Sequence, residues 1–90
     1  MTAYKYTIKI GQPRGCPMLR EVYSKHITFY DVLKDEDIRA VAWDNPTTGN
    51  LPTYVEVNGD GLPTGKYFSM VDQKQVYIRN EDDIVWGLYS

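Results

Sequence analysis

Alternating apolar and polar side chains predict that this chain forms mostly β-strands. From residue 4 to residue 10, Tyr and Ile occupy the even positions and Lys and Thr occupy the odd positions. A period of two residues is typical of a strand with one face in the core and the other in water. β-type runs bounded by turn residues come next at residues 38–43, 53–57, 66–71, 75–79 and 84–89.

The residues that follow the first expected strand have no regular pattern up to residue 17, and the pattern of the next ten residues is ambiguous. Residues 11–17 contain two Gly and two Pro, a combination that predicts a loop. Residues 18–27 have apolar side chains at helical spacing but also β-branched and aromatic content, and we favour a strand. Thr28 followed by Asp31 then resembles a helix-capping box with Asp in place of Glu. The apolar residues after Thr28 are spaced i, i+3 and i+4, which predicts a short helix near residues 28–35.

Turn signals define how these elements connect. Residues 44–50 and 58–61 are rich in Asn, Asp and Gly, and the short polar segment 72–74 favours a hairpin between two strands. The sequence therefore predicts an all-β or β-dominated α+β fold. We expect a small antiparallel sheet or barrel of about five to seven short strands with one short helix, all in a single domain over residues 1–90.

Composition and charge narrow the class of protein. Of the 90 residues, 42% are hydrophobic and 24% are charged, which is ordinary for a globular domain. No apolar run is long enough to span a membrane, and the single cysteine, Cys16, cannot form an internal disulfide. These features predict a protein without membrane association, in a reducing compartment such as the cytoplasm.

Charge is distributed unevenly along the chain. Residues 1–34 carry six Lys or Arg against two acids, whereas residues 35–90 carry ten acids against four Lys or Arg. Two acidic triplets, at 35–37 and 81–83, contain much of the negative charge. Such runs usually mark solvated turns; the alternative is an acidic patch that attracts a basic partner.

The residues that catalysis or metal binding would require are scarce. Cys16 and His26 are the only pair that could form a Cys–His nucleophile. The segment 56–61 approaches the start of a calcium-binding loop, but Tyr67 stands where the loop needs a bidentate Glu, and a β-turn is favoured instead. Mononucleotide and dinucleotide motifs are absent from the sequence. We therefore expect no enzymatic activity, no catalytic residues, no metal site and no cofactor.

Aromatic side chains with a polar edge, by contrast, are abundant. The chain has eight Tyr and two Trp, residues that supply rigid contact area and a hydrogen-bonding tip. This composition favours a small protein-binding module. The expected exposed anchors are Tyr30, Trp43, Tyr67 and Tyr77. The expected steering charges are Asp35, Glu36, Asp37, Asp82 and Asp83. For Trp43 and Trp86, burial in the core is the competing interpretation.

Several functions of a binding module stay open. The main hypothesis is a regulator or inhibitor that blocks a site on a larger protein, as small accessory proteins of phages and mobile elements do. One alternative is a β-barrel that binds single-stranded nucleic acid, since Lys5 and Lys9 lie on the wet face of the first strand; a sequence pI of about 5.2 disfavours it. The other alternative is a self-assembling subunit, a homo-oligomer held by charge or by sheet edges.

Overall fold

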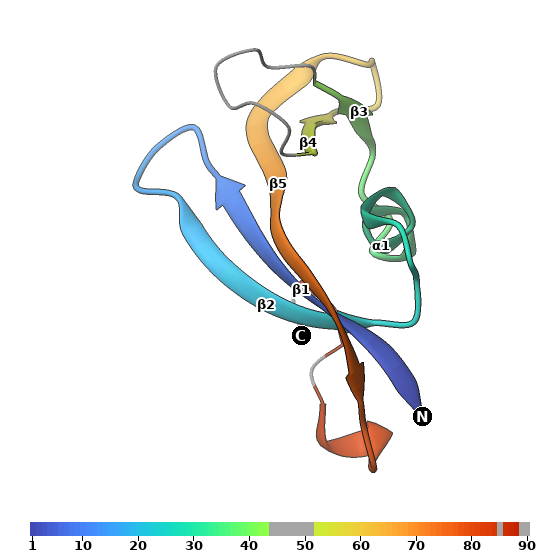
Figure 1. Ribbon diagram of the computed structural model, residues 1–90. Helices are drawn as coiled ribbons and strands as arrows, with labels where there is room; N and C mark the ends of the chain where they lie inside the picture. Colours follow the sequence, from blue (N-terminus) through green and yellow to red (C-terminus); the bar gives the residue numbers. More distant parts are fainter. Residues whose placement is uncertain (44–51, 85, 89–90) are drawn as a thin grey trace.

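In the computed structural model, the described residues are 1–43, 52–84 and 86–88, with the Asp83 side chain left out of the description. These residues form one five-stranded sheet with the order β2-β1-β5-β4-β3, together with one short α-helix (Figure 1). The elements are β1 (Thr2–Gly11), β2 (Met18–Ser24), α1 (Phe29–Asp35), β3 (Ala40–Ala42), β4 (Thr53–Val57), β5 (Pro63–Tyr77) and the 3₁₀ turn η1 (Glu81–Asp83).

All neighbouring strands are antiparallel, which confirms the predicted fold class. The strand favoured within residues 18–27 is β2, and the helix expected near residues 28–35 is α1. Thr28 is the N-cap of α1, and its side chain accepts a hydrogen bond from the Asp31 backbone N–H. The turn predicted over residues 44–50 lies outside the described residues.

The core confirms the alternation in β1. Its even-numbered side chains Tyr6, Ile8 and Ile10 are buried, whereas Lys9 on the other face is exposed. The buried side chains of β1 pack with residues from β2, α1, β5 and the C-terminal segment. These partners are Val22, Phe29, Val32, Leu33, Phe68 and Leu88.

The hairpin predicted at residues 72–74 is wrong, because these residues lie inside the single long strand β5. Asp72, Gln73 and Lys74 pair in register with Thr7, Tyr6 and Lys5 of β1. The run has no Gly, Asn or Pro to require a turn, and pairing with β1 satisfies its backbone in an extended conformation. The register shifts beside Val71, where a β-bulge bends β5.

The last predicted strand, over residues 84–89, is also absent from the described part of that segment. Asn80 caps η1 instead, and its side chain accepts a hydrogen bond from the Asp82 backbone N–H. The chain then returns toward the core, where Leu88 is fully buried and its N–H donates to Glu36 Oε1 at 3.0 Å. A local cap and one buried anchor thus replace strand pairing in this segment.

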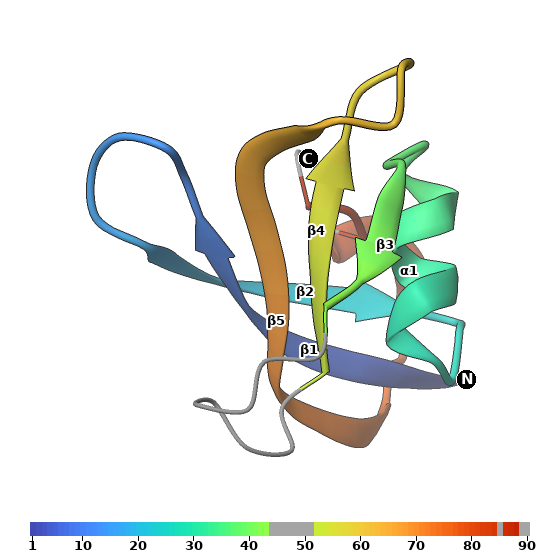
Figure 2. The same ribbon diagram turned by 90° about the horizontal axis from the view of Figure 1, so that it is seen from above.

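The two faces of the sheet differ in what covers them. Tyr54 of β4 contacts Phe29 and Tyr30 of α1, with ring centroids 5.6 and 5.5 Å apart. We call this side of the sheet the inner face. The β1–β2 hairpin runs steeply across the direction of β4 and helps to enclose the core (Figure 2). Because side chains alternate along a strand, the neighbours of Tyr54 along β4 point to the opposite side, the outer face.

A hydrogen-bond network ties the centre of the sheet to the segment that leads into α1. The Tyr6 hydroxyl donates to the His26 carbonyl at 2.5 Å and accepts from Gln73 Nε2 at 2.9 Å. Gln73 Nε2 also donates to the Ile27 carbonyl. Two strands therefore fix the β2–α1 connection, which in turn positions the helix over the inner face.

Replacing Tyr6 by Phe should lower the free energy of unfolding by about 1–3 kcal/mol, because the His26 carbonyl and the Gln73 amide lose a shared partner in a partly buried place. Urea denaturation followed by circular dichroism measures this change. Tyr77→Phe is the matched control, since Tyr77 is 77% exposed and its change should stay within about 0.5 kcal/mol. Equal stability of the Tyr6 variant and the wild type would contradict the role of the network.

The stability should also depend on the ionisation of Tyr6. Burial raises the pKa of Tyr6 above its ordinary value of 10.0, and the hydrogen bond from Gln73 only partly opposes this. A raised pKa in the folded state gives stabilisation that is complete below the unfolded pKa and is lost as the pH rises through the folded pKa. The free energy of unfolding of the wild type should therefore fall more steeply above pH ~10 than that of Tyr6→Phe. Parallel curves for the two proteins would contradict this expectation.

Candidate functional site

An apolar groove opens on the outer face, where β3, β4 and β5 lie side by side. It has a volume of about 430 Å³ and is lined by Val41, Ala42, Trp43, Val55, Pro63, Gly65 and Tyr67. We call it the Trp43–Tyr67 groove. Two of the four predicted aromatic anchors, one from the end of β3 and one from β5, thus meet in a single depression.

Strand register explains why these residues meet. Val41 pairs with Val55, Val55 pairs with Tyr67, and Tyr67 pairs with Gly11 of β1. Residues directly opposite each other in antiparallel strands project to the same face. The floor of the groove is therefore one row of side chains from β3, β4 and β5, which ends at Gly11 of β1. Trp43 continues β3 by one residue, and its N–H donates to the Thr53 carbonyl.

Two glycines allow the groove wall to form. A Cβ at Gly11 would lie 1.9 Å from Tyr67 Cε1, so the Tyr67 ring lies directly over this backbone position. Gly65 has φ +93°, and a Cβ there would lie 2.8 Å from Pro13 Cγ. The loop between β1 and β2 thus packs beside the groove through Pro13, and β5 can accept this contact because residue 65 has no side chain.

The groove is open to solvent. Val41 is 54% exposed and Trp43 is 47% exposed, so the competing interpretation, in which Trp43 is buried in the core, is wrong. Trp43 extends past the end of the short strand β3, on the face that α1 does not cover. A contiguous exposed apolar surface on a small protein is typical of an interaction site.

The other two predicted anchors lie elsewhere. Tyr30 is on α1, where it packs against Tyr54 and lies 5.2 Å from Lys34 Nζ, measured to the ring centroid. Tyr77 ends β5 and is 77% exposed. The structure therefore brings together Trp43 and Tyr67 and leaves Tyr30 and Tyr77 outside the groove.

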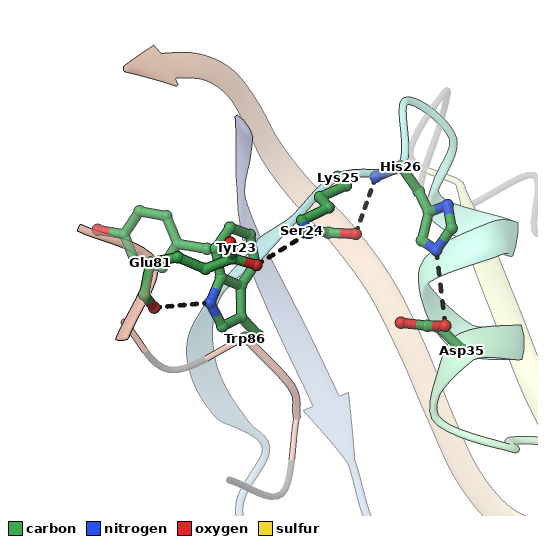
Figure 3. A pocket seen from close by; sticks show the side chains of 7 residues that line it. All are labelled: Tyr23, Ser24, Lys25, His26, Asp35, Glu81 and Trp86. Atoms are coloured by element: carbon green, nitrogen blue, oxygen red, sulfur yellow. Dashed lines mark hydrogen bonds and ion pairs between the residues drawn. The ribbon is translucent and has the colours of Figure 1, made fainter. Parts of the chain in front are cut away.

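One of the predicted acidic residues, Asp35, lines a second, polar cavity of about 330 Å³. Its lining includes Asp35 from the first acidic triplet and Glu81 from the second, with Lys25 and His26 between them (Figure 3). The two triplets therefore border the same cavity. Glu81 pairs with Lys25 at 2.8 Å, and Asp35 Oδ1 lies 3.7 Å from His26 Nε2.

The remaining acids have different surroundings. Glu36 is half-buried and accepts the hydrogen bond from Leu88, which gives it a structural role. Asp37 comes after α1 with φ 58°, a left-handed conformation that ends the helix. Asp82 is exposed in η1. The Asp83 side chain lies outside the description. The steering role of these acids stays a prediction.

The polar cavity has the residue types of a Ser–His–Asp triad but a different geometry. The Ser24 hydroxyl accepts a hydrogen bond from the His26 backbone N–H at 3.1 Å, and the imidazole Nε2 faces Asp35 (Figure 3). A nucleophilic serine must instead bond to the imidazole that removes its proton. Cys16 is no substitute, because it lies before β2 whereas His26 lies after it, about 20 Å apart along seven extended residues.

Metal binding finds no support among the described residues, which contain no cluster of three or more His, Cys, Asp or Glu. The calcium-like segment is a turn in which Asn58 Oδ1 accepts from the N–H groups of Asp60 and Leu62, as the β-turn interpretation predicted. Within the same described part of the chain, no helix is long and apolar enough to cross a membrane.

Some residues of the two cavities were missed by sequence reasoning. Residues 38–43 were predicted as a strand, and the period of two residues in a strand places Val41 and Trp43 on one face, which is a usable signal for half of the groove. Val55 and Pro63 carried no such signal, because their place depends on pairing with β3 and β5. Trp86 lines the polar cavity, where its Nε1 donates to the Glu81 carbonyl and Lys25 Nζ lies 5.8 Å from the centroid of its ring.

Comparison with known proteins gives no match, so the functional interpretation is based on the structure. No family model, curated protein or solved structure matches the chain.

Gly11→Ala should lower the free energy of unfolding by about 1–3 kcal/mol, because the new methyl group must displace the Tyr67 ring. Gly59→Ala is the control, since a Cβ there meets nothing within 4 Å. The loss should shrink when Gly11→Ala is made in a Tyr67→Ala background, and urea denaturation of the double-mutant cycle measures this coupling. Additive effects would show that the ring does not lie over Gly11.

Proposed function

We propose that this protein is a non-enzymatic protein-binding module that holds a segment of a larger protein in the Trp43–Tyr67 groove. The observation that carries the proposal is the meeting of two aromatic side chains, the exposed Trp43 and the half-buried Tyr67, on an otherwise aliphatic floor. Trp and Tyr are the residues that most often dominate binding energy at interfaces, especially where surrounding contacts exclude water.

The form of the groove fits this role. Its floor belongs to a sheet, and Val41, Val55 and Tyr67 are fixed by strand pairing on at least one side. A rigid surface loses little conformational entropy when it binds. The volume of the groove lies near the low end of the roughly 300–1,000 Å³ typical of ligand pockets. It therefore suits one or two apolar side chains of a partner, with the rest of the partner lying over the rim.

The absence of an assembled catalytic set among the described residues supports the non-enzymatic part of the proposal. In the polar cavity, Lys25 and Glu81 are paired with each other, and Ser24 is bonded to backbone. A module of this kind acts by binding to its partner and not by catalysing a reaction. By covering a site on its partner, the chain would regulate or inhibit that partner.

Trp43→Ala should weaken binding to the partner at least tenfold, which corresponds to about 1.4 kcal/mol. The experiment is affinity capture from the native cell lysate with the wild type, Trp43→Ala and Tyr77→Ala immobilised in parallel, followed by mass spectrometry. Tyr77→Ala is the matched control, because it removes an exposed tyrosine outside the groove. A protein captured by the wild type and by the control, but lost with Trp43→Ala, is the expected result.

Trp43 also offers a spectroscopic readout. In a Trp86→Phe background it is the only tryptophan, and its emission should shift to shorter wavelength when a partner removes it from water. A bound partner that leaves this emission unchanged would contradict the proposed site.

A further inference from the structure

Cations border the Trp43–Tyr67 groove on two sides. Arg39 lies two residues before Val41, and its carbonyl accepts from Val57 N–H, so strand pairing extends to it. Alternation therefore places Arg39 on the outer face with Val41 and Trp43. On the opposite side, Arg14 comes directly after Pro13, which contacts Gly65, and Lys9 pairs with Ser69 of β5.

These cations are exposed and without an acidic partner in the described part of the chain. Lys9, Arg14 and Arg39 are exposed, and no ion pair with a described carboxylate involves them. Other cations are neutralised: Lys5 lies 3.4 Å from Glu21, and Lys25 lies 2.8 Å from Glu81. Three exposed cations thus flank the groove on a protein whose net charge is −2.

From this arrangement, and resting on the proposed function, we infer that the groove binds an extended acidic segment of its partner. An apolar side chain of that segment enters between Trp43 and Tyr67, and carboxylates on either side meet Arg39 and Arg14. Arg pairs with carboxylates through two parallel hydrogen bonds, which gives direction as well as attraction. Lys9 adds attraction on the β1 side.

The strand spacing predicts the spacing of the carboxylates. Arg39 extends β3, and Arg14 lies beyond the end of β1, three strand separations away in the order β1-β5-β4-β3. Three separations of roughly 4.8 Å amount to about 14 Å, which an extended peptide covers in four or five residues. The segment therefore has two acidic residues about four or five positions apart, with a large apolar residue between them.

A single-stranded nucleic acid is the competing ligand, because it would also combine stacking with positive charge. The floor of the groove disfavours it: Val41, Val55 and Pro63 offer side-chain volume for an apolar anchor and no further stacking rings. Three cations also neutralise few phosphates, and the overall charge of the chain opposes a polyanion.

Selection from a display library of random 12-residue peptides tests the inference. The wild type serves as bait, and binders to Trp43→Ala are removed beforehand. Enriched peptides should contain an apolar residue between two Asp or Glu four or five positions apart. The Kd of a synthetic peptide of that sequence should rise at least tenfold with Arg39→Glu, and about as much when NaCl is raised from 50 to 500 mM.

Two variants guard against misleading results. Arg14 lies in a loop, and Arg14→Glu should raise the Kd of the peptide, as Arg39→Glu does. Circular dichroism confirms that each variant is folded. Lys74→Glu makes the same change of charge at a position on β5 that is seven residues from Tyr67. Lys74 Nζ lies 3.9 Å from Asp72 Oδ2. This variant should leave the Kd within about twofold.

The outcomes separate this inference from the proposed function. Enriched peptides that depend on Trp43 but lack the acidic pair would overturn the inference and leave the binding module intact. A selection without any peptide that depends on Trp43 would overturn both. Tighter, Trp43-dependent binding of an oligothymidine than of the best peptide would assign the groove to nucleic acid and overturn both as well.

Discussion

The pairing of β5 with β1 is the interaction on which the rest of the structure depends. β5 runs for 15 residues, and its second part pairs with β1 while its first part pairs with β4. Without this strand the β1–β2 hairpin and the β3–β4 hairpin would be separate, and a single two-stranded hairpin is marginally stable in water. One long strand therefore joins two weak units into a sheet that can bury a core.

The same strand leaves one face of the sheet open. The only α-helix among the described elements has seven residues, and it packs against Tyr54 on the inner face with the buried side chains of β1, β2 and β5. The outer face of β3 and β4 has no comparable cover from any described helix. Trp43 and Val41 are consequently exposed to solvent beside the half-buried Tyr67 on a rigid support, which is the physical basis of the proposed binding site.

Local patterns in the sequence predicted those parts of the fold that depend on local interactions. The alternation in β1, the capped helix α1 and the Asn58 turn were all correct, because each rests on side-chain period or on a short-range hydrogen bond. The hairpin at 72–74 and the strand over 84–89 were wrong for the opposite reason. Pairing with β1 keeps Gln73 extended, and the burial of Leu88 determines the path of the last segment; both contacts join distant parts of the chain.

The candidate site shows the same division. Sequence reasoning selected Trp43 and Tyr67 as anchors, but only the register of β3, β4 and β5 shows that they meet while Tyr30 and Tyr77 do not. The uneven distribution of charge is visible in the sequence, but only the fold shows which charged side chains lie close together. Asp35 and Glu81 border one cavity together with His26 and Lys25, whereas Arg39 and Arg14 remain unpaired with described acids beside the groove. Charge placement in space, and not along the chain, is the basis for assigning an acidic segment to the groove.

The central claim is that this protein acts by binding through the outer face of its sheet. Hydrogen–deuterium exchange of the protein, free and in complex with the partner captured from its native lysate, tests the claim most directly. The account predicts added protection in β3 and in the first part of β5, around Val41 and Tyr67. Protection confined to α1 and η1, with these strands unchanged, would contradict it.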